Sequence, residues 1–259
     1  MRIAVLLKEV PDTYSDRDMN LETGLTDRTG EVAADEVSER AVEAALCIAE
    51  KLGKDDVHVE VLSVGPKQAA ESVRRGIAMG ANDATMVTDD RLIGADATMT
   101  ATVLAEVIRR GNYDLVIAGT MSSDGGTGVI APMLGELLNW PALTNLTELE
   151  VVGKQVTAIQ LGDHVTSKLR AELPAVVAVS DEFADARFPN FKGLMAAKKK
   201  ELTTLTLDDL GIDAENFTPA RAIMVSIDRR PPREQGEIID ESSTSAAQLV
   251  DFLESKNLI

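Results

Sequence analysis

The feature that most constrains the fold is a regular alternation of short apolar runs with longer segments of helical period. The short runs are residues 2–7, 57–64, 84–87 and 115–118. Between them, apolar residues recur three and four positions apart, the spacing that gives a helix one buried face. Strands that alternate with helices build a parallel sheet, because each helix carries the chain back to the same edge of the sheet. The sequence therefore predicts an α/β domain with helices on both faces of a parallel sheet.

Residues that begin and end helices mark the segments between these strands. Ser38 is the expected N-cap of the first helix, and glycines or an asparagine suit the ends of all four. We expect helices from about Ser38 to Gly53, from Pro66 to Gly80, from about Asp96 to Gly111, and from the end of the 118–130 segment to just before Asn139.

The pattern changes after residue 142. Residues 151–156 have the character of two strands around a turn, and residues 165–169 and 175–179 of further short strands, which predicts antiparallel additions to the sheet. From Asp181 onward regular periodicity fails, and only residues 245–258 regain helical spacing. We therefore expect a domain over residues 1–180 and an extended arm over residues 181–259, which packs on something other than its own core.

Charge and composition exclude several classes of function. A net charge of −17 disfavours nucleic acid and anionic membranes as partners. No apolar run approaches the about 20 residues of a membrane span, and the short apolar stretch at the start has no signal-peptide cleavage site. A soluble cytoplasmic protein without membrane insertion is expected. The single cysteine, Cys47, is expected in the core, and with two histidines the chain has no zinc-site spacing, so no metal site is predicted.

A loop rich in glycine and hydroxyl groups follows the apolar run at 115–118. It reads AGTMSSDGGTGVI over residues 118–130. The glycines would let an anion approach the backbone, and the next helix would offer unpaired N–H groups. Asp124 is unfavourable beside a phosphate unless it faces a ribose, a cation or a partner chain. The spacing matches neither dinucleotide nor Walker fingerprints, so a ligand-free turn and a phosphate cradle both remain open.

Other segments resemble a known family. LPAVVAVSDEFADARFPNFKGLMAAKKKEL, at residues 173–202, resembles the signature segment of the β subunit of electron-transfer flavoproteins, with Ala-Arg-Phe in place of the usual Pro-Arg-Tyr. The other matching segments occur in the same order along the chain: VLLKEVPDT at the start, SERAVEAAL at 38–46, LSVGPKQAAESVRRGIAMGA at 62–81, SSDGGTG at 122–128 and DRRPPREQG at 228–236.

This resemblance implies a heterodimer in which the α subunit holds the redox-active FAD. The β subunit would have an adenine-nucleotide α-hydrolase-like (Rossmann-like) fold and bind AMP without a redox role. It would be an electron carrier subunit rather than an enzyme, since it needs no catalytic residue. By resemblance, the nucleotide contacts are Leu6, Asp35, Glu36, Val37, Ser38, Val64, Gly119, Ser122, Ser123, Asp124, Gly125, Gly126, Thr127, Gly128 and Val129.

The same resemblance implies partners and a docking segment. Electrons would come from acyl-CoA or similar dehydrogenases, as in fatty acid oxidation, and pass to a quinone oxidoreductase. Residues 187–196 match the family's recognition loop, with Phe191 as its apolar anchor; the alternative is that Phe191 packs on its own domain. Lys198, Lys199 and Lys200 either form a solvated face or steer an acidic partner. The predicted docking residues are Arg187, Phe188, Phe191, Lys192, Leu194 and Met195.

Three alternatives were weighed against this interpretation. A bifurcating relative would hold a second FAD in the same cleft, but its Asp-Gly-Asp-Thr-Ala-Gln-Val-Gly loop is absent here. An ATP-dependent enzyme of the related pyrophosphatase fold would carry Ser-Gly-Gly-x-Asp-Ser after the first strand, where this chain has Lys-Glu-Val-Pro-Asp at 8–12. A lone ATP-binding stress-type module would need no long arm. AMP is therefore favoured.

Overall fold

The computed structural model describes residues 1–14, 18–216, 221–233, 235–236, 238–240 and 244–259. Contacts group the chain into two units, Met1–Ser226 and Ile227–Ile259. In the described residues of the second unit there is one helix, α7 (Ser245–Ser255), within the residues for which the sequence predicts helical spacing. Of the 228–236 motif, residue 234 lies outside the described residues. In the isolated chain residues 181–226 belong to the first unit, and the packing of 181–259 on a partner subunit stays a prediction.

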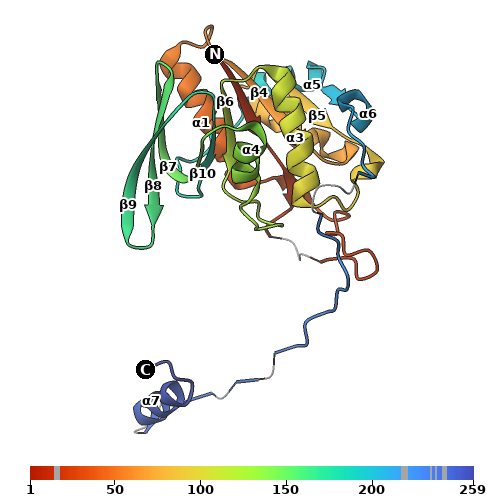
Figure 1. Ribbon diagram of the computed structural model, residues 1–259. Helices are drawn as coiled ribbons and strands as arrows, with labels where there is room; N and C mark the ends of the chain where they lie inside the picture. The colour runs from red at the N-terminus through yellow and green to blue at the C-terminus, as the bar shows by residue number, and fades with distance from the viewer. Residues whose placement is uncertain (15–17, 217–220, 234, 237, 241–243) are drawn as a thin grey trace. The chain divides into compact units, whose positions relative to one another are not determined.

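A nine-stranded sheet forms the centre of the first unit, in the order β11-β5-β4-β1-β6-β10-β7-β8-β9 (Figure 1). The first seven of these strands pair in parallel, which confirms the predicted fold class. They are β11 (Thr203–Leu205), β5 (Asp83–Val87), β4 (His58–Val64), β1 (Arg2–Leu6), β6 (Leu115–Gly119), β10 (Ala175–Val179) and β7 (Ala142–Val152).

Antiparallel strands extend the sheet on one side, as the sequence predicts for residues 151–156 and 165–169. The prediction is wrong for residues 175–179, because β10 pairs in parallel with β6 and β7. β8 (Gln155–Gly162) pairs antiparallel with β7, and β9 (Val165–Glu172) pairs antiparallel with β8. A separate two-stranded antiparallel sheet joins β2 (Glu9–Pro11) to β3 (Val32–Ala34). This small sheet follows β1 directly, so it lies at the carboxyl end of the parallel strands.

Helices cover both faces of the parallel sheet (Figure 1). They are α1 (Glu36–Leu52), α2 (Ala70–Met79), α3 (Ala97–Gly111) and α4 (Ile130–Leu138). On β1, Ile3 and Val5 pack with the helices α1 and α2, whereas Ala4 and Leu6 pack with α3 and α4. Alternate side chains of a strand point to opposite faces, so a strand buried on both sides is apolar throughout. Among the described residues, no helix is long and apolar enough to cross a bilayer.

The start of α1 differs from the prediction. Asp35, not Ser38, is the N-cap: its carboxylate accepts a hydrogen bond from the backbone N–H of Ser38 at 3.1 Å. Ser38 is therefore the third residue of the helix. The sequence offers two capping residue types three positions apart, and the side chain that reaches the free N–H groups decides between them.

The region after residue 181 is more regular than the sequence indicates. It contains α5 (Phe191–Lys199), the sheet strand β11 and the short helix α6 (Leu207–Leu210). In α5 only Ala197 is buried, so the helix has no apolar stripe for a periodicity argument to detect. β11 has three residues, too few to show alternation. Phe191 lies in the stretch where periodicity fails, yet it begins α5.

The core of the parallel sheet gives a direct test of this architecture. Ile117 in β6 is fully buried, whereas Val165 in β9 is 63% exposed. We expect Ile117→Ala to lower the free energy of unfolding by about 2–5 kcal/mol, because the lost transfer free energy of the removed atoms adds to the cost of the cavity that they leave. Val165→Ala should change it by less than about 0.5 kcal/mol. Urea unfolding of both variants measures the difference, and equal losses would contradict the assigned layers.

Candidate functional site

The loop predicted to bind phosphate connects β6 to α4 and begins in close contact with α1. β6 ends at Gly119, and a Cβ atom on this glycine would lie 3.0 Å from the carbonyl carbon of Val37 and 3.2 Å from the backbone nitrogen of Ser38. Any larger residue would push the strand end away from the helix. The fold thus brings Gly119, Val37 and Ser38 together, at the sheet edge where parallel α/β proteins bind ligands.

Asp35 ties the loop to the start of α1. Its side chain is almost fully enclosed, with the residue 1% exposed. One carboxylate oxygen accepts from the backbone N–H and hydroxyl of Ser38 at 3.1 and 3.0 Å, and the other accepts from the backbone N–H of Ser123 at 2.9 Å. A single buried carboxylate therefore fixes the distance between two elements predicted to contact the nucleotide.

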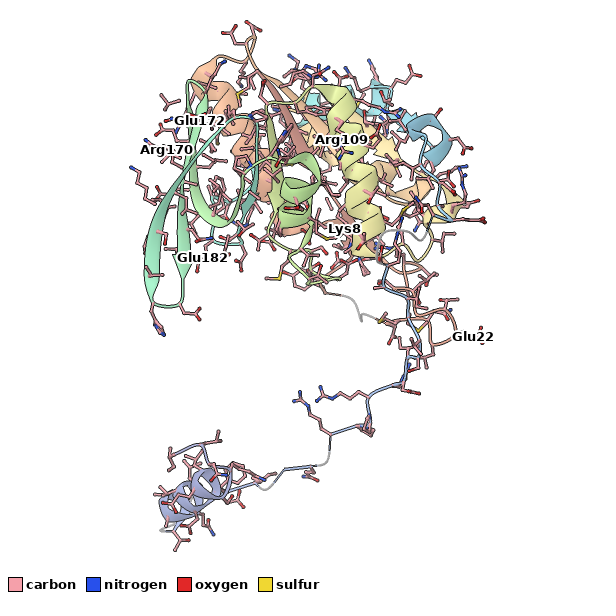
Figure 2. The ribbon with its side chains drawn as sticks, in the orientation of Figure 1. Lys8, Glu22, Arg109, Arg170, Glu172 and Glu182 are labelled. Atoms are coloured by element: carbon pink, nitrogen blue, oxygen red, sulfur yellow. The ribbon has the colours of Figure 1, made fainter. Side chains whose placement is uncertain are left out.

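Asp124 turns into the fold and is neutralised there. One carboxylate oxygen accepts from Lys8 Nζ at 2.6 Å and from the hydroxyl of Ser122 at 2.8 Å, and the other accepts from Arg28 Nη2 at 3.0 Å. The Asp124 side chain is only 5% exposed. The sequence leaves a ribose, a cation or a partner chain open as the partner of Asp124, and in the structure its partners are cations. Figure 2 labels Lys8 at the sheet edge where these segments meet.

The pKa of Asp124 reflects this surrounding. Burial raises the pKa, but the hydrogen bond and charge of Lys8, together with the Ser122 hydroxyl and the Gly125 N–H, outweigh burial. The net result is a pKa below the usual value for aspartate. The carboxylate is therefore charged at neutral pH, and its negative charge is balanced inside the loop rather than directed at a ligand.

The loop amides divide into two groups. The N–H groups of Ser123, Gly125 and Gly126 donate within the protein, to Asp35, to Asp124 and to the carbonyl of Ser122. For residues 127–129, no acceptor is found in the described part of the chain. Helix α4 also begins without a side-chain cap, unlike α1. Uncapped N–H groups at a helix start carry positive potential, so these amides can bind an anion.

The remaining predicted nucleotide residues lie around the same edge. Leu6 and Val64 end the neighbouring strands β1 and β4 on the face that carries α3 and α4, whereas Glu36 is exposed and pairs with Arg40. The buried hydroxyl oxygens of Ser63 and Thr120, also at strand ends, have no partner among the described residues. Sequence reasoning missed the roles of Lys8 and Arg28: Lys8 lies in the VLLKEVPDT segment and Arg28 in no motif, and both meet Asp124 only through the fold.

The predicted docking segment is exposed, but one member is not. Phe188 and Phe191 are 88% and 79% exposed, and Leu194 and Met195 also face solvent, as does Lys192. The alternative that Phe191 packs on its own domain is therefore wrong for this chain. Arg187 instead binds Glu43 and Glu50 of α1 through its guanidinium group. In the basic triplet, Lys200 pairs with Asp83 at 2.6 Å, and Lys198 and Lys199 are exposed.

Cys47 makes one side-chain hydrogen bond within α1. The Cys47 thiol donates to Glu43 at 3.2 Å, and burial with this hydrogen bond raises its pKa above the usual value. Cys47 is partly buried rather than fully in the core. Among the described residues, no group of three or more histidine, cysteine, aspartate or glutamate side chains could hold a metal ion.

Comparison with known proteins identifies the family. The electron transfer flavoprotein domain model matches residues 23–210. The chain belongs to the electron transfer flavoprotein family. It is 39% identical to the electron transfer flavoprotein subunit beta of Mycobacterium leprae (strain TN), with 99% of each chain covered. Identity is 32% to that of Bacillus subtilis (strain 168), covering 99% of this chain and 98% of the other. It is 27% to that of Megasphaera elsdenii, with both chains fully covered.

The resemblance found in the motifs is thereby confirmed. The chain matches β subunits of electron transfer flavoproteins from end to end, and the family model spans both the glycine-rich loop and the docking segment.

The inward ion cluster predicts how stability depends on pH. Asp124 has a lowered pKa in the folded chain, so its contribution is present above the unfolded pKa of about 3.9 and is lost as pH falls through the lower folded value. We expect Asp124→Asn to reduce the free energy of unfolding by about 1–3 kcal/mol near neutral pH, because Lys8 and Arg28 lose a charged acceptor.

Urea unfolding at several pH values measures this difference, which should shrink below a pH of about 4. Asp90→Asn is the matched control, since Asp90 is exposed. A difference that grows on acidification would contradict the role given to the Asp124 charge.

Proposed function

We propose that this chain is the β subunit of a heterodimeric electron-transfer flavoprotein that binds AMP and docks dehydrogenases. An α subunit would hold the FAD, accept electrons from acyl-CoA or similar dehydrogenases and pass them to a quinone oxidoreductase. The observation that carries the proposal is the loop after β6, in which Asp124 is neutralised inward and the amides of residues 127–129 stay open.

A phosphate group suits the charge around this loop. The chain as a whole carries −17, so an anion needs local positive potential. Lys8 and Arg28 balance the charges of Asp124 and Asp35, and the uncapped start of α4 adds the positive partial charge of its N–H groups. These groups fit the phosphate of a mononucleotide.

The rest of the edge suits an adenosine. Leu6 and Val64 end their strands with apolar side chains, against which a base could pack. AMP would order the loop and take no part in electron transfer. Redox chemistry would come from the FAD of the α subunit. This chain would bind the α subunit and dock the dehydrogenase that donates the electrons. We propose no bond-breaking step and no general acid or base in this subunit.

AMP is favoured over a second FAD by the sequence of the loop. The bifurcating branch places Asp-Gly-Asp-Thr-Ala-Gln-Val-Gly there, and this chain has Ser-Ser-Asp-Gly-Gly-Thr-Gly at 122–128. ATP-dependent chemistry is disfavoured because Lys8 is bound to Asp124 and the segment after β1 reads Lys-Glu-Val-Pro-Asp in place of Ser-Gly-Gly-x-Asp-Ser.

Docking follows from the exposed apolar side chains at the start of α5. Aromatic side chains are strong anchors in interfaces because each buries a large apolar area. Phe188 and Phe191 have most of that area available, and Lys192 adds a cation beside them. A dehydrogenase with an apolar pocket and an acidic rim would fit this surface.

Glycine substitution tests the nucleotide loop with a matched control. Gly126 and Gly153 both have a φ of 60° and open space around the position of a Cβ atom. Valine at either site imposes a similar backbone strain of about 1–2 kcal/mol. We expect Gly126→Val to lower the AMP content of the purified αβ complex at least about tenfold, whereas Gly153→Val leaves it unchanged. Full AMP content in Gly126→Val would argue against this loop as the site.

Truncation of the exposed anchor tests the docking role. We expect Phe191→Ala to raise the KM of a dehydrogenase for the αβ complex about tenfold, because burial of this side chain supplies roughly 1.5–3 kcal/mol. FAD and AMP content should not change. Val152→Ala removes an apolar side chain that is 67% exposed at a distant turn and serves as the control. If reduction kinetics are the same for both variants and the parent, Phe191 has no docking role.

A further inference from the structure

Arg187 is bound to its own domain at every side of its guanidinium group. Its backbone N–H and its Nε both donate to Glu43 Oε2, at 3.0 and 2.7 Å, and Nη2 donates to Glu43 Oε1 at 2.8 Å. The same group donates to Glu50 through Nη1 at 2.7 Å and Nη2 at 3.2 Å. Glu43 and Glu50 are seven residues apart on α1, two helical turns, and so lie on one face.

This arrangement is stronger than an ordinary surface ion pair. The Glu43 side chain is 10% exposed, and the fork of an arginine matches a carboxylate in two parallel hydrogen bonds. Burial raises the pKa of Glu43, but hydrogen bonds from Arg187 outweigh it and the net pKa is lowered. Hydrogen bonds from Arg187 and Lys54 lower the pKa of Glu50 to about 2. Both carboxylates are therefore charged at neutral pH.

The chain before Arg187 is also fixed to α1. Arg40 pairs with Asp185 at 2.8 Å and donates to the carbonyl of Phe183, which is buried. Arg187 is the last of these attachments. The next residue, Phe188, is the most exposed aromatic side chain of the docking segment.

A second attachment lies just beyond Phe191. Gly193 packs so closely on α2 that a Cβ atom would lie 2.2 Å from the carbonyl oxygen of Ala78. Asn190 caps α5 through the Gly193 N–H at 2.8 Å, and Arg74 of α2 donates to the carbonyls of Ala197 and Lys200. Phe188 and Phe191 thus lie in a short span held at both ends, on α1 and on α2.

Two exposed phenylalanines need such restraint. Burying an apolar side chain against nearby apolar surface lowers the free energy of the chain in water. A loose segment would therefore collapse onto its own domain. We propose that Arg187, through Glu43 and Glu50, is a positioning residue that holds Phe188 and Phe191 in the docking geometry. This inference rests on the proposed docking function. It gives Arg187 an internal role in place of the direct partner contact that the resemblance implies.

Fixing the segment in advance has a defined consequence for binding. A partner that meets an ordered segment does not lose further free energy by ordering it, so the complex is tighter without any new contact. We call the contacts of Arg187 with Glu43 and Glu50 the clamp. Its loss should weaken docking and leave the steps after docking unchanged.

The test uses the αβ complex with Arg187→Met, the conservative Arg187→Lys, and Arg91→Met as the matched control. Arg91 also bridges two carboxylates, those of Asp89 and Asp208, but lies outside the docking segment. For Arg187→Met we expect the KM of a dehydrogenase for the complex to rise about tenfold with kcat and nucleotide content unchanged. Arg187→Lys should recover part of the loss, and Arg91→Met should match the parent.

Hydrogen exchange at residues 188–194 gives a readout that does not need a dehydrogenase. Exchange should become faster in Arg187→Met and stay at the parent rate in Arg91→Met. Unchanged exchange would overturn the clamp even if docking is confirmed. If Phe191→Ala leaves KM unaltered, docking itself fails while the exchange result still decides the clamp. If Phe191→Ala raises KM and Arg187→Met does not, the positioning role is overturned.

A milder variant covers a failure of assembly. Should the Arg187→Met chain not form the complex, Glu50→Gln removes the charge of the more exposed carboxylate and keeps Glu43 in place. Faster exchange at residues 188–194 in that variant supports the clamp, and exchange at the parent rate overturns it.

Discussion

The rest of the site depends on the charge of Asp124 being balanced inside the loop. Lys8 and Arg28 reach this carboxylate from segments far away in sequence, and the loop folds around the resulting cluster. With the carboxylate bound to these cations, the charge of Asp124 does not oppose an anion at the uncapped start of α4 or at the amides of residues 127–129, for which no acceptor is found among the described residues. Were Asp124 turned outward, its repulsion of a phosphate would oppose the attraction of those amides.

Buried carboxylates organise both regions to which we assign a function. Asp35 joins the glycine-rich loop to α1 at one end of that helix, and Glu43 joins the docking segment to its middle. Each accepts backbone N–H groups from a segment that lies outside regular structure at that point. Helix α1 is therefore the common support of a proposed nucleotide site and a proposed docking surface. The acidic composition of the chain serves, at these positions, to hold irregular backbone in place.

The sequence predicts the parallel strands and their helices because periodicity is strong where both faces of a sheet are buried. It also predicts the loop after β6. It does not predict that Ser123, Gly125 and Gly126 use their amides internally, since those contacts depend on Asp35 and on the orientation of Asp124. β11 and α5 were missed because one is three residues long and the other exposes its apolar side chains. The pairing of Arg187 with Glu43, 144 residues away, leaves no local signal.

The nucleotide content of the assembled complex tests the central claim most directly. The αβ complex is purified without added nucleotide and denatured, and the released nucleotides are separated and quantified against protein. A set of open loop amides that binds one mononucleotide predicts one AMP and one FAD per heterodimer. Two FAD per heterodimer, or FAD alone with no adenine mononucleotide, would contradict it.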